Sequence, residues 1–119
     1  MAAINIHPYR LVTTTAAGTS TITTDLTVPA GKRIILDVIE LKFGTSAANN
    51  TVDIQTAKAG SGYANIWPQI TTFVYTAVDL ASMFPRTIEL EATDVLRIIH
   101  TRGTSSTCES ILYYISRDI

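Results

Sequence analysis

Cys108 and His100 are the first residues whose types could do chemistry together. A thiol becomes a nucleophile when an adjacent base and an electropositive pocket lower its pKa. Cys108 follows a Thr/Ser loop and His100 ends the strand before that loop, so the two side chains could meet across a hairpin. Two residues alone form no wider motif, and a half-buried Cys beside a strand-end His is more often structural. We therefore expect no catalytic dyad here.

Carboxylates are the second chemical candidates. A glycosidase needs two of them facing each other across a cleft. Asp37 is the only acid in an otherwise apolar stretch, where burial would raise its pKa, but no partner is evident. Glu89, Glu91 and Asp94 are the densest acidic group, yet Glu89 and Glu91 alternate with apolar residues, as on the solvent face of a strand. We therefore predict no catalytic residues.

The sequence also argues against metals, cofactors and nucleic acids. One Cys and two His are too few for the four ligands of a zinc site. The Gly60–Gly62 segment lacks the helix and Lys of a phosphate-binding loop. Nine basic residues are scattered among ten acidic ones, with a net charge of -1, whereas nucleic-acid binding needs clustered Lys and Arg. We expect no cofactor, no metal and no nucleic-acid partner.

Two regions carry residues suited to binding. Tyr63 and Trp67, flanked by Asn65 and Gln69, could stack on a sugar ring or anchor a protein interface. Trp67 could instead be the core aromatic residue of the domain.

The second region is the N-terminal stretch, whose candidate interface residues are Ile4, Ile6, Tyr9 and Arg10. Residues 1–10 could form the first edge strand of the domain. They could instead be an extended arm that adds a strand to a neighbouring subunit. A sheet edge needs cover in either case.

The elements that must position these residues are strands, because apolar and polar residues alternate with a period of two. Turn signals recur every 8–12 residues, and 46% of residues are hydrophobic. The pattern predicts one all-β domain over residues 1–119, a jelly-roll-like β-sandwich of about eight antiparallel strands. A closed barrel fits the same pattern. Residues 78–83 are ambiguous and could form one helical turn. The expected strands are 19–28, 33–43, 51–56, 63–67, 70–76, 87–91, 95–100 and 110–116.

The longest expected strand, 33–43, changes character along its length. Its second half alternates, with Ile39, Leu41 and Phe43 on one face and Glu40 and Lys42 on the other. Its first half is apolar on both faces except for Asp37. This indicates a central strand covered on both sides, or a bulge where the alternation shifts.

Cellular setting follows from what the chain contains. The single cysteine permits no intrachain disulfide, which suits a reducing compartment. No run of 18 apolar residues predicts a membrane span, and the first residues are unlike a signal peptide. We expect synthesis in the cytoplasm and no membrane partner.

Two stretches resemble a known family. One is the Leu26–Leu41 entry into a long apolar strand through Val-Pro-Ala-Gly-Lys, followed by Asn50–Gln55. The other is the strand–turn–strand segment Ile88–Ile98. Their order and spacing, over residues 19–116, are similar to those of small β-sandwich structural proteins of tailed bacteriophages and prophages. In this chain Thr93 stands where that family usually has a Gly, at a turn position where positive φ is costly for Thr.

The resemblance implies a virion component that decorates or cements a capsid. It implies a jelly roll or related sandwich, with capsid protein or further copies of itself as partners, and a trimer as the expected oligomer. The alternative is a carbohydrate- or receptor-binding module, which rests on Tyr63, Trp67 and the Tyr-rich last strand. A third hypothesis, an enzyme, rests only on Asp37 and the Cys108–His100 pair.

Overall fold

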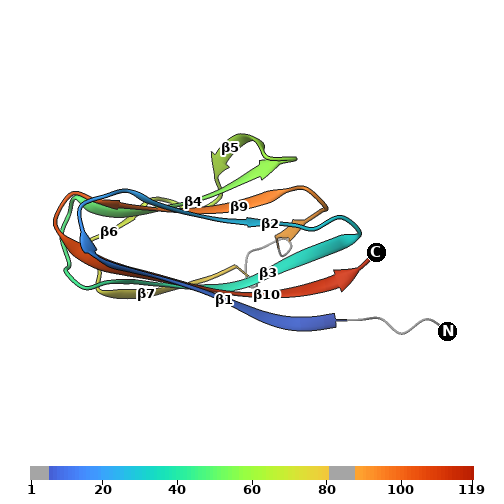
Figure 1. Cartoon of the computed structure of the whole chain (residues 1–119), viewed down its shortest axis with the longest axis horizontal. Coiled ribbons are helices and arrows are strands. Elements are labelled where there is room, and N and C mark those ends of the chain that lie inside the picture. The colour runs from blue at the N-terminus through green and yellow to red at the C-terminus, as the bar shows by residue number, and fades with distance from the viewer. Residues whose placement is uncertain (1–5, 81–87) are drawn as a thin grey trace.

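The chain folds as a sandwich of two antiparallel β-sheets in a computed structural model, which describes residues 6–80 and 88–119, with side chains from Tyr9 onward (Figure 1). No helix occurs in these residues. The predicted all-β sandwich is therefore confirmed, and the closed barrel is excluded because the strands form two separate sheets.

Each sheet contains five strands. Sheet A consists of β1 (Ile6–Gly18), β3 (Lys32–Phe43), β7 (Tyr75–Asp79), β8 (Glu89–Leu90) and β10 (Ser106–Asp118). Sheet B consists of β2 (Ile22–Thr27), β4 (Asn50–Lys58), β5 (Ser61–Asn65), β6 (Ile70–Thr71) and β9 (Val95–Arg102). The count exceeds the expected eight because β1 adds a strand and because the expected strand 70–76 is divided into β6 and β7.

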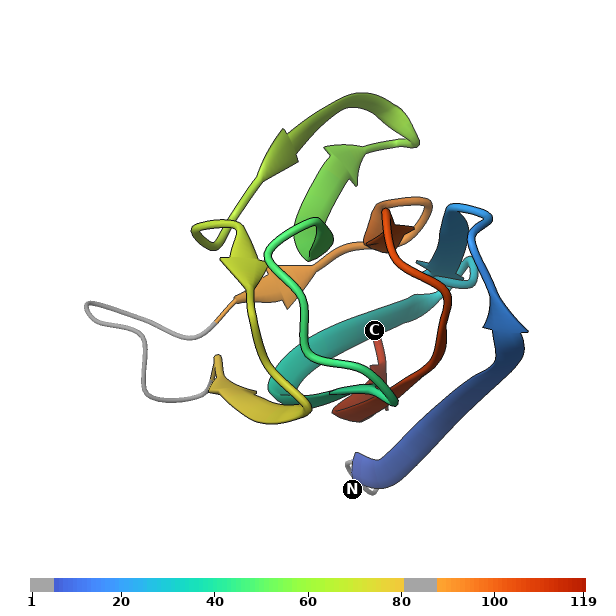
Figure 2. The same cartoon turned by 90° about the vertical axis from the view of Figure 1, so that its left-hand side faces the viewer.

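The strand order is that of a jelly roll. Sheet A has the order β1-β10-β3-β7, with β8 also paired to β3. Sheet B has the order β2-β9-β4-β5, with β6 also paired to β4. From β1 to β4 the chain changes sheet at every connection, so the sheets are wound together, as the end view shows (Figure 2).

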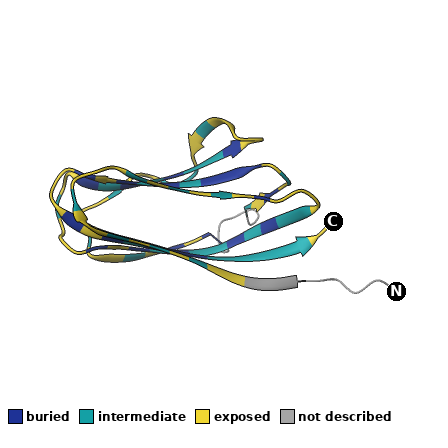
Figure 3. Ribbon diagram, viewed as in Figure 1, coloured by how far each residue is buried: buried dark blue, intermediate teal, exposed yellow. Residues whose placement is uncertain are grey.

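The core lies between the sheets and follows from the predicted alternation. β2 alternates strictly between half-buried and exposed residues. In β3 the inward residues Ile39, Leu41 and Phe43 are buried, as predicted (Figure 3). The buried apolar cluster comprises Val28, Ile34, Leu36, Ile39, Leu41, Phe43, Val52, Ile54, Val78, Leu80, Leu90, Leu96, Ile98, Cys108 and Leu112.

The change of pattern inside β3 is a β-bulge. Val38 pairs with Tyr113 and Leu36 pairs with Tyr114, so Asp37 is the extra residue. Its carbonyl oxygen accepts a hydrogen bond from the Leu80 backbone at 2.7 Å. The bulge interpretation of residues 33–43 is therefore correct. β3 is also central in its sheet, but the second sheet covers only its inner face, and Ile35 and Val38 on the outer face are half-buried.

Two local predictions were wrong. Residues 70–76 do not form one strand, because Thr72 has a φ of +60° and separates β6 from β7. The helical turn considered for residues 78–83 does not occur at Val78 and Asp79, because both residues belong to β7. Residues 81–83 lie outside the described residues.

Thr93 stands at the turn position where the similar family usually has a Gly, and its φ is +72°. Its N–H donates to the Val28 carbonyl oxygen at 2.9 Å, and Val28 N–H donates to the Asp94 carbonyl oxygen at 2.9 Å. These bonds hold the turn in the left-handed region despite the Cβ of Thr93.

We predict that Thr93→Gly raises the free energy of unfolding by about 1 kcal/mol, because glycine adopts positive φ without steric cost. Urea denaturation measures the change. Thr27→Gly in strand β2 is the matched control, and it should destabilise because glycine is disfavoured in extended strands. Destabilisation by both substitutions would contradict the strain at Thr93.

Candidate functional site

Three of the four N-terminal candidates lie on β1, an edge strand of sheet A: Ile6, Tyr9 and Arg10. Ile6 pairs with Arg117 of the same chain, and its side chain lies outside the described residues, as does all of Ile4. Tyr9 is 45% exposed and stacks on Tyr114, with ring centroids 5.4 Å apart. Arg10 is exposed beside it. The segment from Ile6 onward is thus the first edge strand.

Tyr63 and Trp67 do not form an open aromatic surface. The Arg97 guanidinium carbon lies 3.7 Å from the centroid of the Tyr63 ring and covers one of its faces. Trp67 is half-buried and packs against the core cluster, as expected of a core aromatic residue.

The polar groups around Tyr63, on the outer face of sheet B, bind one another. Arg97 donates to both carboxylate oxygens of Asp25, at 2.8 and 2.9 Å. This bond lowers the pKa of Asp25, against the effect of its partial burial. Asp53 accepts hydrogen bonds from the side-chain amides of Asn65 and Gln69 at 3.1 to 3.2 Å. These partners would have to be displaced by any ligand.

The hairpin across which Cys108 and His100 could have met is absent. His100 is on β9 of sheet B and Cys108 is on β10 of sheet A, and both side chains are buried. Burial, helped by the positive charge of Arg102, lowers the pKa of His100 to about 4. His100 packs edge-on against Phe43, with ring centroids 5.3 Å apart. These are the environments of core residues.

The acidic candidates are also dispersed. Asp37 lies at the β3 bulge, and Glu89 and Glu91 are exposed as predicted. Asp94 is buried, which raises its pKa, but the N–H groups of Ala59 and Glu91 and the ammonium of Lys58 outweigh this effect and lower the pKa overall. In residues 6–80 and 88–119 no three His, Cys, Asp or Glu side chains gather as a metal site would need.

The outer face of sheet A differs from that of sheet B. Successive residues of a strand point to opposite faces of the sheet. The residues that point outward are therefore those next in sequence to the inward-pointing Leu36, Ile39, Leu41 and Leu112. Strand pairing then places apolar residues side by side on neighbouring strands, in rows that also contain Arg10 and Glu40. We call this set the outer band: Val12, Ile35, Val38, Ile111, Tyr113 and Ile115.

The corresponding positions of sheet B are mostly polar. Asp25, Arg97, Gln55 and Asn65 form one row across four strands. Thr101 pairs with Thr51, which pairs with Thr71, in another. The two faces of the sandwich are therefore chemically distinct.

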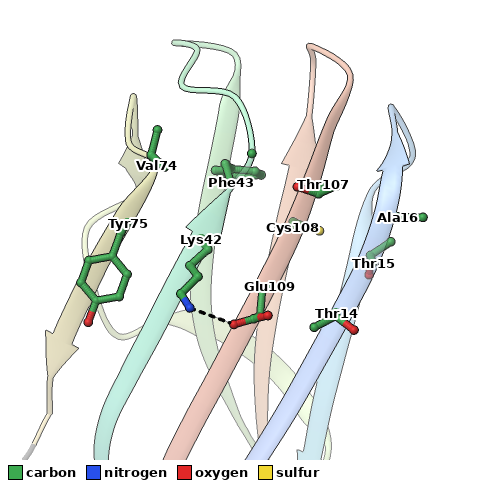
Figure 4. A pocket seen from close by; sticks show the side chains of 11 residues that line it. Thr14, Thr15, Ala16, Lys42, Phe43, Val74, Tyr75, Thr107, Cys108 and Glu109 are labelled. Atoms are coloured by element: carbon green, nitrogen blue, oxygen red, sulfur yellow. Dashed lines mark ion pairs between the residues drawn. The ribbon is translucent and has the colours of Figure 1, made fainter.

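A groove crosses the end of sheet A next to the outer band and holds about 510 Å³ (Figure 4). The side chains that matter for its chemistry are Tyr75 of β7, Lys42 of β3, Glu109 of β10 and Thr14 of β1. These four residues form one row of paired positions across the sheet. Lys42 Nζ lies 3.2 Å from Glu109 Oε1. Figure 4 shows Lys42 between Tyr75 and Glu109.

Glu40 accepts hydrogen bonds from two tyrosines beside the groove. The Tyr75 hydroxyl donates to Glu40 Oε1 at 3.2 Å, and the Tyr113 hydroxyl donates to Glu40 Oε2 at 3.4 Å. Desolvation and this hydrogen bond raise the pKa of Tyr75. The ring of Tyr75 is held by its hydroxyl, yet the residue is 54% exposed.

Sequence reasoning missed this groove, although one signal was available. The alternation already placed Glu40 and Lys42 on the face opposite the core. It could not show that β7 and β10 flank them, because strand order depends on long-range pairing.

Comparisons with known proteins add no identity: no protein-family model and no curated protein matches the chain. The described residues include no apolar helix of the length needed to cross a bilayer.

Proposed function

We propose that the chain is a non-enzymatic structural protein of a virion, which decorates or cements a phage capsid through oligomeric surface contacts. The observation that carries the proposal is the outer band on sheet A. Sheets that face water on one side normally alternate apolar-in and polar-out. Sheet B follows that rule on its outer face, whereas sheet A presents aliphatic and aromatic residues there among charged residues such as Glu40 and Lys42.

The band suits weak contacts repeated by symmetry. Val12 is 42% exposed, Ile35, Val38, Tyr113 and Ile115 are half-buried, and Ile111 is buried. Covering apolar surface stabilises an assembly by about 25 cal/mol per Å², so one such contact is modest. Symmetric copies repeat the contact, and multivalency supplies the overall affinity for a capsid lattice.

The placement of the reactive groups supports a role without catalysis. Cys108 and His100 are core residues. Asp94 accepts backbone hydrogen bonds that tie two turns together. The carboxylates of Asp25 and Glu40 hold Arg97 and two tyrosines, respectively. Each of these groups has a structural use.

Native mass, measured by light scattering, tests the proposal. We expect an oligomer, a trimer by the resemblance, for the unmodified chain. Val12→Asp should give a monomer, because assembly would bury an unpaired carboxylate. The matched control is Thr23→Asp, at an exposed position on the edge strand of sheet B, which should keep the native mass. A monomeric unmodified chain, or equal masses for both variants, would refute assembly through the outer band.

A further inference from the structure

We propose that the groove at the end of sheet A binds a neutral saccharide, with one sugar ring stacked on Tyr75. This site goes beyond the proposed structural role, and it lies on the opposite sheet from Tyr63 and Trp67. It would give a capsid-bound protein a second activity, the recognition of surface glycans.

Tyr75 has the properties of a stacking platform. The face of an aromatic ring is electronegative, so it attracts the polarised C–H groups on one side of a sugar ring. Tyr75 is 54% exposed, and Val74 beside it is 56% exposed. The hydrogen bond to Glu40 fixes the ring before a ligand arrives. Such preorganisation reduces the entropy lost on binding.

The neighbouring side chains supply donors and acceptors for sugar hydroxyls. The Lys42 ammonium donates and the Glu109 carboxylate accepts, and the two groups are 3.2 Å apart. A pair of adjacent hydroxyls can engage both groups, since each hydroxyl can donate and accept. Thr14, Thr15 and Thr107 also line the groove, and Thr14 pairs with Glu109 across the strands.

Charge and size favour a neutral ligand over other classes. Among the described residues Lys42 is the only cation that lines the groove, and Glu109 already neutralises it, so a phosphate or sulfate would meet an adjacent carboxylate. A wholly apolar ligand would leave this ion pair desolvated without new partners. The volume of about 510 Å³ falls in the range of small-molecule sites, which accommodates a mono- or disaccharide.

The test titrates the full chain with neutral disaccharides of glucose, galactose, mannose and N-acetylglucosamine, followed by NMR. We expect millimolar or tighter binding of at least one disaccharide. Tyr75→Ala should weaken that binding tenfold or more, whereas Tyr75→Phe should retain most of it because the ring remains. The matched control is Tyr63→Ala on the outer face of sheet B, which should bind as the unmodified chain does.

Three outcomes would overturn the site: no binding of any neutral disaccharide, binding that Tyr75→Ala leaves unchanged, or preference for sulfated over neutral sugars. Failure of the assembly proposal is separable. Val12→Asp changes native mass and should keep sugar binding, while Tyr75→Ala should lose sugar binding and keep native mass. Backbone NMR shifts of Tyr75→Ala that match the unmodified chain outside the groove establish that the variant is folded.

Discussion

We expect Arg102→Met to lower the free energy of unfolding by about 3 to 5 kcal/mol, since each buried acceptor left without a donor costs about 1 to 3 kcal/mol. Arg102 is 5% exposed and points into the end of the sandwich. Its guanidinium donates to the carbonyl oxygens of Ala16, Ser20 and Ser106 at 2.7 to 2.8 Å. Methionine fills the space of the aliphatic stem but leaves these acceptors without a donor.

Arg97→Met is the matched control, because Arg97 is on the same strand and faces outward. Its ion pair with Asp25 is partly exposed, so we expect a loss of no more than about 1 kcal/mol. Urea denaturation of both variants measures the difference, provided the m-values agree. If Arg102→Met costs no more than Arg97→Met, the three carbonyl contacts do not close this end of the sandwich.

The second large effect is a loss of stability between pH 6.5 and pH 4 caused by His100. Burial lowers its pKa in the folded chain from 6.5 to about 4. In that interval the unfolded chain binds a proton that the folded chain excludes, so the free energy of unfolding rises with pH. The contribution is complete above pH 6.5 and decreases as the pH falls, by about 3 kcal/mol in all.

The carboxylates act in a different interval. The pKa values of Asp25 and Asp94 are lowered from 3.8, so their contribution is present above that pH and is lost below it. His100→Gln removes the titration in the upper interval, since an amide stays neutral. We expect the slope of unfolding free energy between pH 6.5 and pH 4 to flatten in this variant. An unchanged slope would place the pH dependence elsewhere in the chain.

The sequence by itself determined the local features of the fold. The alternation of apolar and polar residues assigned the faces of β2 and β3. Asp37, the only acid in an otherwise apolar stretch, indicated the bulge. The turn before Asp94 was recognisable, including the position where Thr93 takes positive φ. These features depend on residues adjacent in the chain, whose sterics and side-chain direction act without distant partners.

Only the tertiary structure decided which face of β10 is inside and which strands are neighbours. β10 has apolar residues on both faces, so Leu112 and Ile111 are equivalent in the sequence. Leu112 nevertheless belongs to the core cluster, whereas Ile111, which is also buried, pairs with the exposed Val12. The apparent hairpin between His100 and Cys108 is a crossing between sheets. Glu40 meets two tyrosines from distant strands. Such contacts arise from long-range pairing, in which a shift of one residue would exchange the two faces.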